Sequence, residues 1–370
     1  MRIAILHPCF VSLGGGEQTA GVLAETFPQA DVFSLLCDQE GLPSQLLGKT
    51  VHSLPINWLP VKYSYFRHLL PFWPVAIESI DLRGYDVVIT SDSSVMKGAL
   101  VDQSATHICY CHSPMRCLWD LHREYYESMP RLIRPLFAVG THYVRQWDFQ
   151  AAQRIDHFIA NSMHIAQRIH KYYRRTSFVI YPPVKTGLGY IAEHCACDYY
   201  LSVSRLTVMK RIDLLIEACN RLNRRLIVVG AGREERKLKN LAGPTIEFLG
   251  RVADTDLATL YANCRAFLFA ADEDFGIAPV EAQAFDRPVI AFGHGGSLET
   301  VRANDSDGRS DTGIFFPEQR VESIVDSIKR FEMREGGFVP EEIQQHARQF
   351  DTSVFVDRMR QFVDAAVGKE

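Results

Sequence analysis

The chain has 370 residues, a net charge of −4 and 47% hydrophobic residues, which is enough for two domains with full cores. The acidic balance argues against a general nucleic-acid-binding protein, and no uninterrupted apolar stretch reaches the length that spans a bilayer. Nine cysteines without a framework spacing or paired CxxC motifs argue against a disulfide scaffold and a zinc site. They indicate reduced thiols in a cytoplasmic protein.

Short apolar runs typical of buried strands recur along the whole chain. In the first half they begin at Arg2, Asp31, Asp86, His107 and His157. In the second half they begin at Tyr199, Arg225, Ile246, Ala266 and Pro288. Amphipathic stretches lie between these runs. The alternation predicts an α/β protein with two doubly wound parallel sheets.

The prolines and glycines of residues 181–190 interrupt both helix and strand patterns. We therefore place the domain boundary in this segment, with residues 1–183 in the first domain and residues 184–351 in the second. Residues 352–367 have the periodicity of an amphipathic helix.

Three consecutive glycines, Gly14, Gly15 and Gly16, follow the first apolar run, and a helix is predicted to begin near Glu17. Glycines let the backbone approach a phosphate, and a helix N-terminus supplies amide donors. Nicotinamide-dependent oxidoreductases also place glycines here, but they need a GxGxxG spacing, which this loop lacks. An oxidoreductase is therefore the weaker alternative.

Two stretches combine aromatic and basic side chains, namely residues 54–74 and residues 115–147. Each is explained either as an irregular connection that covers the core or as an acceptor groove or interfacial membrane contact, where aromatic side chains sit at headgroup level. The sequence leaves both explanations open.

Arg205 and Lys210 lie between a predicted strand and a predicted helix. The helix dipole disfavours cations at this end, so an anionic ligand would explain them. Glycines at the ends of later strands, Gly230 among them, would admit a nucleotide closely. Ser297 is expected to cap the next helix.

The segment from Ala271 to Phe292 carries Glu273 in a loop and Glu281 in the following helix, between two apolar runs. In a βαβ unit, ligands bind where the strand ends and the helix begins. The string resembles the E-x7-E signature of glycosyltransferase family 4, which are retaining enzymes with the GT-B fold. The glycine loop also resembles the loop found at this place in the family.

The resemblance implies two Rossmann-like domains that face a cleft, with the last helix, about residues 352–370, returning to the acceptor-binding first domain. It also implies a role for each matching residue. Glu273 would contact the hydroxyls of the donor sugar and Glu281 the ribose, while Arg205 and Lys210 would hold the diphosphate. The remaining implied donor-site residues are Gly14, Gly15, Gly16, Gly230, Arg251, Phe275, Gly276 and Ile277.

His112 lies in the string YCHSPMRCLWD, and a histidine at the end of a strand is more often structural than catalytic. The string resembles a family motif whose histidine bonds to the transferred sugar, which implies that role for His112. This string and residues 204–218 look most like bacterial mannosyltransferases that build O-antigen or exopolysaccharide on lipid-linked acceptors.

The closer likeness implies transfer of mannose from GDP-mannose to a glycan or lipid-linked acceptor in polysaccharide synthesis. The enzyme would work in the cytoplasm, at the inner face of the cell membrane, with peripheral membrane contact. No cofactor and no metal are expected, because side-chain cations serve the diphosphate. A non-catalytic sugar-nucleotide-binding subunit remains the alternative outside enzymes.

Overall fold

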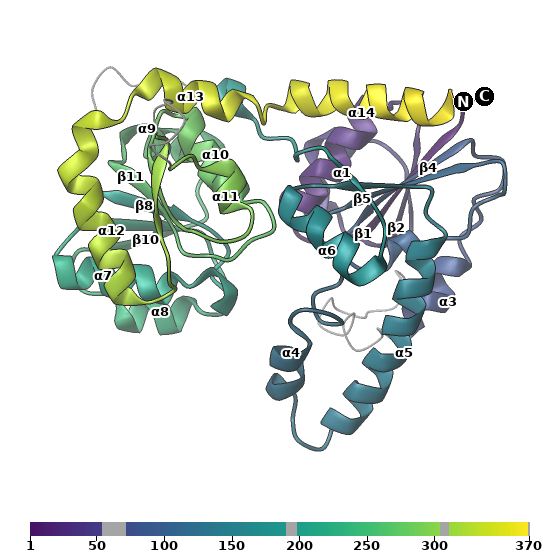
Figure 1. The fold of residues 1–370 in the computed structure, drawn as a ribbon, viewed down its shortest axis with the longest axis horizontal. Coiled ribbons are helices and arrows are strands. Elements are labelled where there is room, and N and C mark those ends of the chain that lie inside the picture. The colour runs from purple at the N-terminus through teal and green to yellow at the C-terminus, as the bar shows by residue number, and fades with distance from the viewer. Residues whose placement is uncertain (54–71, 190–197, 304–310, 369–370) are drawn as a thin grey trace. The chain divides into compact units, whose positions relative to one another are not determined.

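The computed structural model describes residues 1–53, 72–189, 198–303 and 311–368. These residues form two compact units. The first unit comprises Met1–Tyr181 together with Phe355–Glu370, and the second comprises Pro182–Val354. Figure 1 labels the helices and strands of each unit.

The described part of the first unit is built on a parallel sheet with the strand order β3-β2-β1-β4-β5-β6-β7. The strands are β1 (Ile3–Phe10), β2 (Asp31–Cys37), β3 (Val51–Ser53), β4 (Val87–Asp92), β5 (Thr106–Cys111), β6 (His157–Ala160) and β7 (Phe178–Val179). The helices are α1 (Gly15–Thr26), α3 (Trp73–Glu78), α4 (His122–Ser128), α5 (Arg134–Gln153), α6 (Met163–Tyr173) and α14 (Thr352–Val367).

Every residue of β1 is buried, because helices cover both faces of the sheet. On one face α1 packs beside α14, as Figure 1 shows. Phe355, Met359 and Val363 of α14 recur every four residues and enter the same apolar core as Ile3 and Ile5. The C-terminal helix is therefore part of the first unit.

The described part of the second unit repeats this plan, with the strand order β10-β9-β8-β11-β12-β13. The strands are β8 (Tyr200–Val203), β9 (Leu226–Val229), β10 (Ile246–Gly250), β11 (Ala266–Phe269), β12 (Val289–Phe292) and β13 (Gly313–Phe316). The helices are α7 (Ile212–Leu222), α8 (Glu235–Leu241), α9 (Asp254–Asn263), α10 (Ile277–Ala284), α11 (Ser297–Thr300), α12 (Val321–Arg334) and α13 (Pro340–Arg348).

The predicted architecture of two doubly wound α/β units is confirmed. In each sheet the strand order reverses at one point, between β1 and β4 in the first unit and between β8 and β11 in the second. Ligands of open α/β sheets bind outside the carboxyl ends of the strands at such a switch point. The topology therefore marks one candidate region in each unit.

Three described strands were not predicted from the sequence. Strands β3 and β7 have only three and two residues, too short for a hydrophobic pattern to stand out. Strand β13 is a four-residue run that begins with Gly313, and glycine is depleted in strands.

The helix after the glycine loop begins at Gly15, so the predicted start near Glu17 is wrong by two residues. Gly14 is extended and acts as the N-cap, and its carbonyl accepts the backbone N–H of Gln18 at 2.9 Å. Gly15 and Gly16 thus form the first turn of α1. The hypotheses on residues 54–71 lie outside the described residues.

Candidate active site

Two loops meet at the switch point of the second unit. Strands β8 and β11 are parallel neighbours, and the loop after β8 carries Arg205 and Lys210 while the loop after β11 carries Glu273. Because the carboxyl ends of parallel strands lie on one edge of the sheet, these distant segments become adjacent.

The two loops are joined by an ion pair between the Lys210 ammonium and the Glu273 carboxylate. Both side chains remain about a quarter exposed, 23% for Lys210 and 25% for Glu273. Two residues that the sequence assigned to one ligand therefore touch each other at this edge. A partly exposed pair of this kind stabilises a fold only weakly, but it presents both charges to a ligand.

The three cationic side chains of the loop after β8 have different surroundings. Arg205 is exposed, whereas Lys210 ends a short 3-10 turn. Arg211 has a left-handed backbone, with φ of 50°, and its guanidinium donates to both oxygens of Asp213 at 3.3 and 3.2 Å. Asp213 thus engages Arg211, while Arg205 is left exposed beside Lys210 in the loop.

The Glu273 loop is held from behind by the loop after β12. The backbone N–H of Gly296 donates to the carbonyl of Glu273 at 2.8 Å. A Cβ on Gly295 would lie only 2.5 Å from the same carbonyl oxygen, so any larger residue would push the loops apart. Gly276, with φ of 90°, then turns the chain into α10 as its N-cap.

Glu281 lies on α10, one helical turn into the helix. Its Oε2 accepts a hydrogen bond from the Tyr261 hydroxyl at 2.9 Å. Burial raises the pKa of Glu281, and the bond from Tyr261 lowers it in part. The carboxyl group is thus oriented by a neighbour that the sequence did not single out.

The other predicted donor-site residues of this unit are placed as follows. Phe275 is buried and its ring packs against Phe350 at 5.4 Å between centroids, so its side chain belongs to the core. Ile277 is the first residue of α10, and Arg251 is exposed directly after β10. A Cβ on Gly230 would lie 1.9 Å from the carbonyl oxygen of Ser204, so glycine is required for this close approach.

The expected cap at Ser297 is wrong. Gly296 is the N-cap of α11, no side chain caps the helix, and Ser297 is its first residue. The Ser297 hydroxyl is buried and finds no hydrogen-bond partner among the described residues.

At the switch point of the first unit, a hydrogen-bond chain links three strands. His112 follows β5, and its Nε2 lies 2.8 Å from the Ser91 hydroxyl on β4. The same hydroxyl lies 3.0 Å from Nδ1 of His7 on β1. A Cβ on Gly16 would lie 3.6 Å from the His7 ring and 3.9 Å from Nε2 of His112. The glycine loop therefore lies close to both histidines.

His7 and His112, the two histidines linked through Ser91, are both held neutral. Burial, together with the neighbouring His112, lowers the pKa of His7 to about 3. Burial also lowers the pKa of His112 to about 4. A neutral imidazole has one N–H donor and one acceptor nitrogen, so His112 offers a hydrogen bond rather than a charge.

A buried ion cluster holds the end of β4 in place. The Lys97 ammonium lies 3.0 Å from Asp92 and 2.6 Å from Asp148, and all three side chains are inaccessible to solvent. Although burial alone would lower the pKa of Lys97, the two aspartates raise it well above its usual value. The Asp92 carbonyl in turn accepts the backbone N–H of His112 at 2.8 Å.

Ser91 and His7 were missed by the sequence analysis. His7 lies within the apolar strand β1, and Ser91 lies between Thr90 and Asp92 at the end of β4; neither position carries a motif of its own. Only the strand order, with β1 beside β4 and β4 beside β5, shows that the two residues meet His112.

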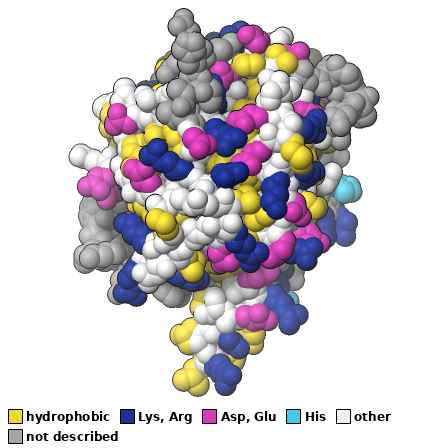
Figure 2. All heavy atoms as spheres, turned by 90° about the vertical axis from the view of Figure 1, so that its left-hand side faces the viewer, with side chains coloured by type: hydrophobic (Ala, Val, Ile, Leu, Met, Phe, Trp, Pro, Cys, Tyr) yellow, Lys and Arg dark blue, Asp and Glu magenta, His cyan; other side chains and the backbone are white. Residues whose placement is uncertain are grey.

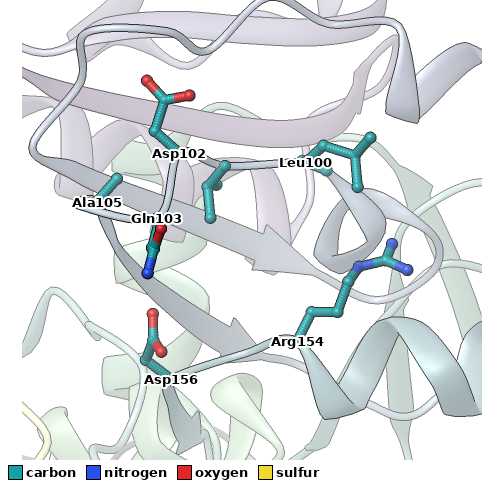
Figure 3. Close-up of a pocket in the computed structure, with 8 residues that line it drawn as sticks. Leu100, Asp102, Gln103, Ala105, Arg154 and Asp156 are labelled. Atoms are coloured by element: carbon teal, nitrogen blue, oxygen red, sulfur yellow. The ribbon is translucent and has the colours of Figure 1, made fainter.

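A pocket of about 220 Å³ lies at the opposite edge of the first sheet, before β5 and β6. Figure 3 shows its lining, which includes Asp102, Arg154 and Asp156. Asp156 already accepts the backbone N–H of His107 at 2.8 Å, and the volume is below the roughly 300–1,000 Å³ of most ligand sites. Within the described ranges, no group of three His, Cys, Asp or Glu residues could hold a metal ion.

Two family models match this chain. The model described as "Glycosyltransferase Family 4" matches residues 13–188, and the model described as "Glycosyl transferases group 1" matches residues 198–350. The two regions together include the glycine loop and β4 of the first switch point and both strands of the second. The fold and these matches define a hexosyltransferase with the GT-B fold, and the chain belongs to glycosyltransferase family 4.

Individual relatives have a low sequence identity to this chain or match only a short part of it. The chain is 23% identical over 369 residues to the alpha-1,3/1,6-mannosyltransferase ALG2 of Saccharomyces cerevisiae, covering 81% of this chain and 71% of that protein. It is 37% identical over 114 residues to a GDP-mannose-dependent monoacylated alpha-(1-6)-phosphatidylinositol monomannoside mannosyltransferase of Corynebacterium glutamicum, covering 26% of this chain and 30% of that protein. The crystal structure of Anabaena Alr3699/HepE in complex with UDP has a TM-score of 0.70 at 17% identity, covering 99% of this chain and all of that one.

In the part of the chain that the structure describes, no helix is long and apolar enough to cross a membrane.

Proposed function

We propose that the protein transfers mannose, with retention, from GDP-mannose to a glycan or lipid-linked acceptor in cell-surface polysaccharide synthesis. The observation that carries this proposal is the Lys210–Glu273 ion pair at the β8/β11 switch point. Two relatives support the choice of sugar, since both are named as mannosyltransferases, and one is named as GDP-mannose-dependent.

In this proposal Lys210 and Arg205 bind the diphosphate of the donor. In the free protein the Lys210 charge is compensated by Glu273. A diphosphate that takes over Lys210 frees the Glu273 carboxylate to accept hydrogen bonds from sugar hydroxyls. The two cations then stabilise the negative charge that grows on the diphosphate as it leaves.

The other site residues bind the donor without a change in their own charge. Glu281 keeps its second carboxylate oxygen for a ribose hydroxyl while Tyr261 holds the first. Neutral His112 offers a hydrogen bond to the transferred hexose, and Arg251 lies near the base.

The transfer exchanges one bond for another at the anomeric carbon. The acceptor oxygen bonds to that carbon as its bond to the diphosphate oxygen breaks, on the same face of the sugar. The leaving phosphate takes the proton of the acceptor hydroxyl, so no nucleophilic carboxylate, metal or cofactor is required. The enzyme acts in the cytoplasm, in peripheral contact with the inner face of the cell membrane.

Thermal unfolding with a panel of nucleotides tests the donor site. The panel contains GDP, UDP, ADP, GDP-mannose, UDP-glucose and NAD. A ligand that binds only the folded state stabilises it by about 2.7 kcal/mol at a hundredfold excess over its dissociation constant. We expect GDP and GDP-mannose to raise the melting temperature, and the anomeric configuration of the product, read by NMR, to match that of the donor.

A Lys210→Ala variant should lose most of the shift given by GDP, whereas Lys237→Ala should keep it, because Lys237 is an exposed lysine of α8. Stabilisation by UDP and UDP-glucose alone would indicate a UDP-sugar donor in place of GDP-mannose. Stabilisation by NAD alone would overturn glycosyl transfer, and binding without turnover would indicate a non-catalytic subunit.

A further inference from the structure

The first unit presents an apolar stripe to solvent along α5 and the turn before it. The stripe consists of Leu132, Leu136, Val139 and Tyr143, and the first three are 96%, 73% and 70% exposed. Leu132 lies in the turn before α5, and the spacing of three and four residues places Leu136, Val139 and Tyr143 on one face of the helix. Single exposed apolar residues are common, but a contiguous exposed set marks a binding surface.

The α4–α5 hairpin projects from the sheet of the first unit in Figure 1. The first seven residues of α5, from Arg134 to Gly140, include no buried residue. The second half of α5 is anchored in the core by Val144, Trp147 and Ala151. Leu132, Leu136 and Val139 thus lie on the part of the hairpin that the core does not use.

Contacts within the hairpin fix which face of α5 points outward. The His122 ring of α4 stacks on Phe137 at 5.8 Å between centroids, and its Nε2 lies 3.1 Å from the Thr141 hydroxyl. Arg134 donates to the carbonyl of Met129 at 3.0 Å and lies 5.6 Å over the Tyr126 ring. Phe137 and Thr141 therefore face α4, and the stripe stays on the outer face.

The α4–α5 hairpin carries a net positive charge. From His122 to Trp147 it has four arginines and two glutamates, and both glutamates, Glu124 and Glu127, lie on α4. From Met129 to Trp147 there are three arginines, Arg131, Arg134 and Arg145, and no aspartate or glutamate. Arg134 and Arg145 donate to backbone carbonyls, which are neutral, so these hydrogen bonds do not compensate the charges. Figure 2 shows hydrophobic and basic side chains mixed at the end of the hairpin.

We propose that the tip of the α4–α5 hairpin docks on an anionic lipid surface, with Leu132 and Leu136 entering the headgroup region. Apolar side chains flanked by arginines have the chemistry of an interfacial element, which combines apolar burial with attraction to anionic lipids. A second copy of this chain fits less well, because its tip would bring arginines against arginines.

This inference rests on the proposed function and deepens it, because it assigns the membrane contact to one hairpin. The measurement is co-sedimentation of the full chain with phosphatidylcholine vesicles and with vesicles of equal parts phosphatidylcholine and phosphatidylglycerol. We expect binding to the second kind at low salt. Binding should weaken at high salt, since the screening length falls from about 30 Å at 0.01 M to about 3 Å at 1 M.

The double variant Leu132→Gln with Leu136→Gln should reduce the partition to anionic vesicles on the order of a hundredfold, about tenfold for each leucine. Arg131→Glu should reduce it less and should flatten its salt dependence. Leu47→Gln is the matched control, because Leu47 is an apolar residue of the same unit that is 63% exposed, outside the hairpin.

The inference is overturned if the wild-type protein ignores anionic vesicles, or if the double variant binds them as well as the Leu47→Gln control. It is also overturned if the double variant instead converts a dimer to a monomer in sedimentation, because the occupant would then be a second copy. Stabilisation of the double variant by GDP-mannose tests the donor site separately. A failure there would count against the proposed donor and not against the hairpin.

Discussion

The two switch points use the same topology for opposite electrostatic purposes. In the second unit a charged pair, Lys210 with Glu273, lies partly exposed at the carboxyl edge. In the first unit the corresponding edge carries neutral groups, His112 and His7, joined through Ser91. A Rossmann-like sheet thus fixes where a ligand binds, while the side chains at the strand ends fix the chemistry of the site.

The difference follows from burial. At the first switch point desolvation favours the uncharged form of both imidazoles, so that edge is suited to hydroxyl groups. At the second, the oppositely charged Lys210 and Glu273 side chains stay partly exposed, so that edge is suited to phosphates.

The largest expected effect comes from removing the cation of the second edge. Lys210→Ala should lower turnover about a hundredfold to a thousandfold, because a preorganised donor to developing negative charge contributes about 2.7–4 kcal/mol. The melting temperature should barely change, since a partly exposed ion pair stabilises by about 0–1 kcal/mol. The measurement is GDP release from GDP-mannose with a membrane lipid extract as the acceptor.

Lys237→Ala is the control for this prediction and should keep full turnover. If Lys210→Ala kept turnover as well, the assignment of the charged edge to the diphosphate would be wrong.

Acidification should reduce the stability of the first unit by protonating three of its histidines, namely His7 and His112 at the carboxyl edge of the sheet and His107 near the start of β5. Burial lowers the pKa of His7 to about 3, and those of His107 and His112 to about 4. In the unfolded chain a histidine titrates near a pKa of about 6.5 and binds its proton first as the pH falls. The stabilisation is thus complete above pH 6.5 and is lost toward pH 4 and 3, by up to about 1.4 kcal/mol per pH unit for each histidine.

Tryptophan fluorescence is a suitable probe, because Trp58, Trp73, Trp119 and Trp147 are the only tryptophans and all precede the second unit. Denaturant unfolding followed by this signal at several pH values gives the slope of the unfolding free energy against pH. His107→Gln should reduce the slope between pH 6.5 and 4, and His142→Gln, at an exposed position, should leave it unchanged. Equal slopes in the wild type and His107→Gln would contradict the prediction.

The smallest effect is expected from the link between the histidines. Ser91→Ala removes the hydroxyl that bonds His112 and His7, which should lower kcat roughly three- to tenfold with little change in KM. The tautomer of His112, read from its ¹⁵N chemical shifts, should become mixed, because Ser91 no longer sets which ring nitrogen bears the proton.

Thr90→Val is the matched control for Ser91→Ala. Thr90 precedes Ser91 on β4, is equally buried, and places its hydroxyl 3.4 Å from Nε2 of a different histidine, His107. If the two variants changed kcat equally, the effect of Ser91 would be one of packing and not of positioning His112.

The sequence alone predicted the fold class, because the alternation of apolar runs and amphipathic stretches is a local pattern. The helical periodicity of residues 352–367 coincides with α14, whereas the resemblance implied a last helix over about residues 352–370. The short edge strands β3 and β7 escaped prediction because two or three residues carry no period.

At the candidate site, local motifs pointed to Arg205, Lys210, Glu273, Glu281 and His112 as candidates. Each follows a predicted strand end, and Glu281 lies one helical turn further along. The sequence could not show that Lys210 pairs with Glu273, that Tyr261 orients Glu281, or that Ser91 links His112 to His7. Those contacts join residues between 20 and 84 positions apart in the chain. The Lys210–Glu273 pair depends on β8 lying beside β11, and the Ser91 contacts depend on β4 lying between β1 and β5. Strand order and helix packing are decided by the whole unit.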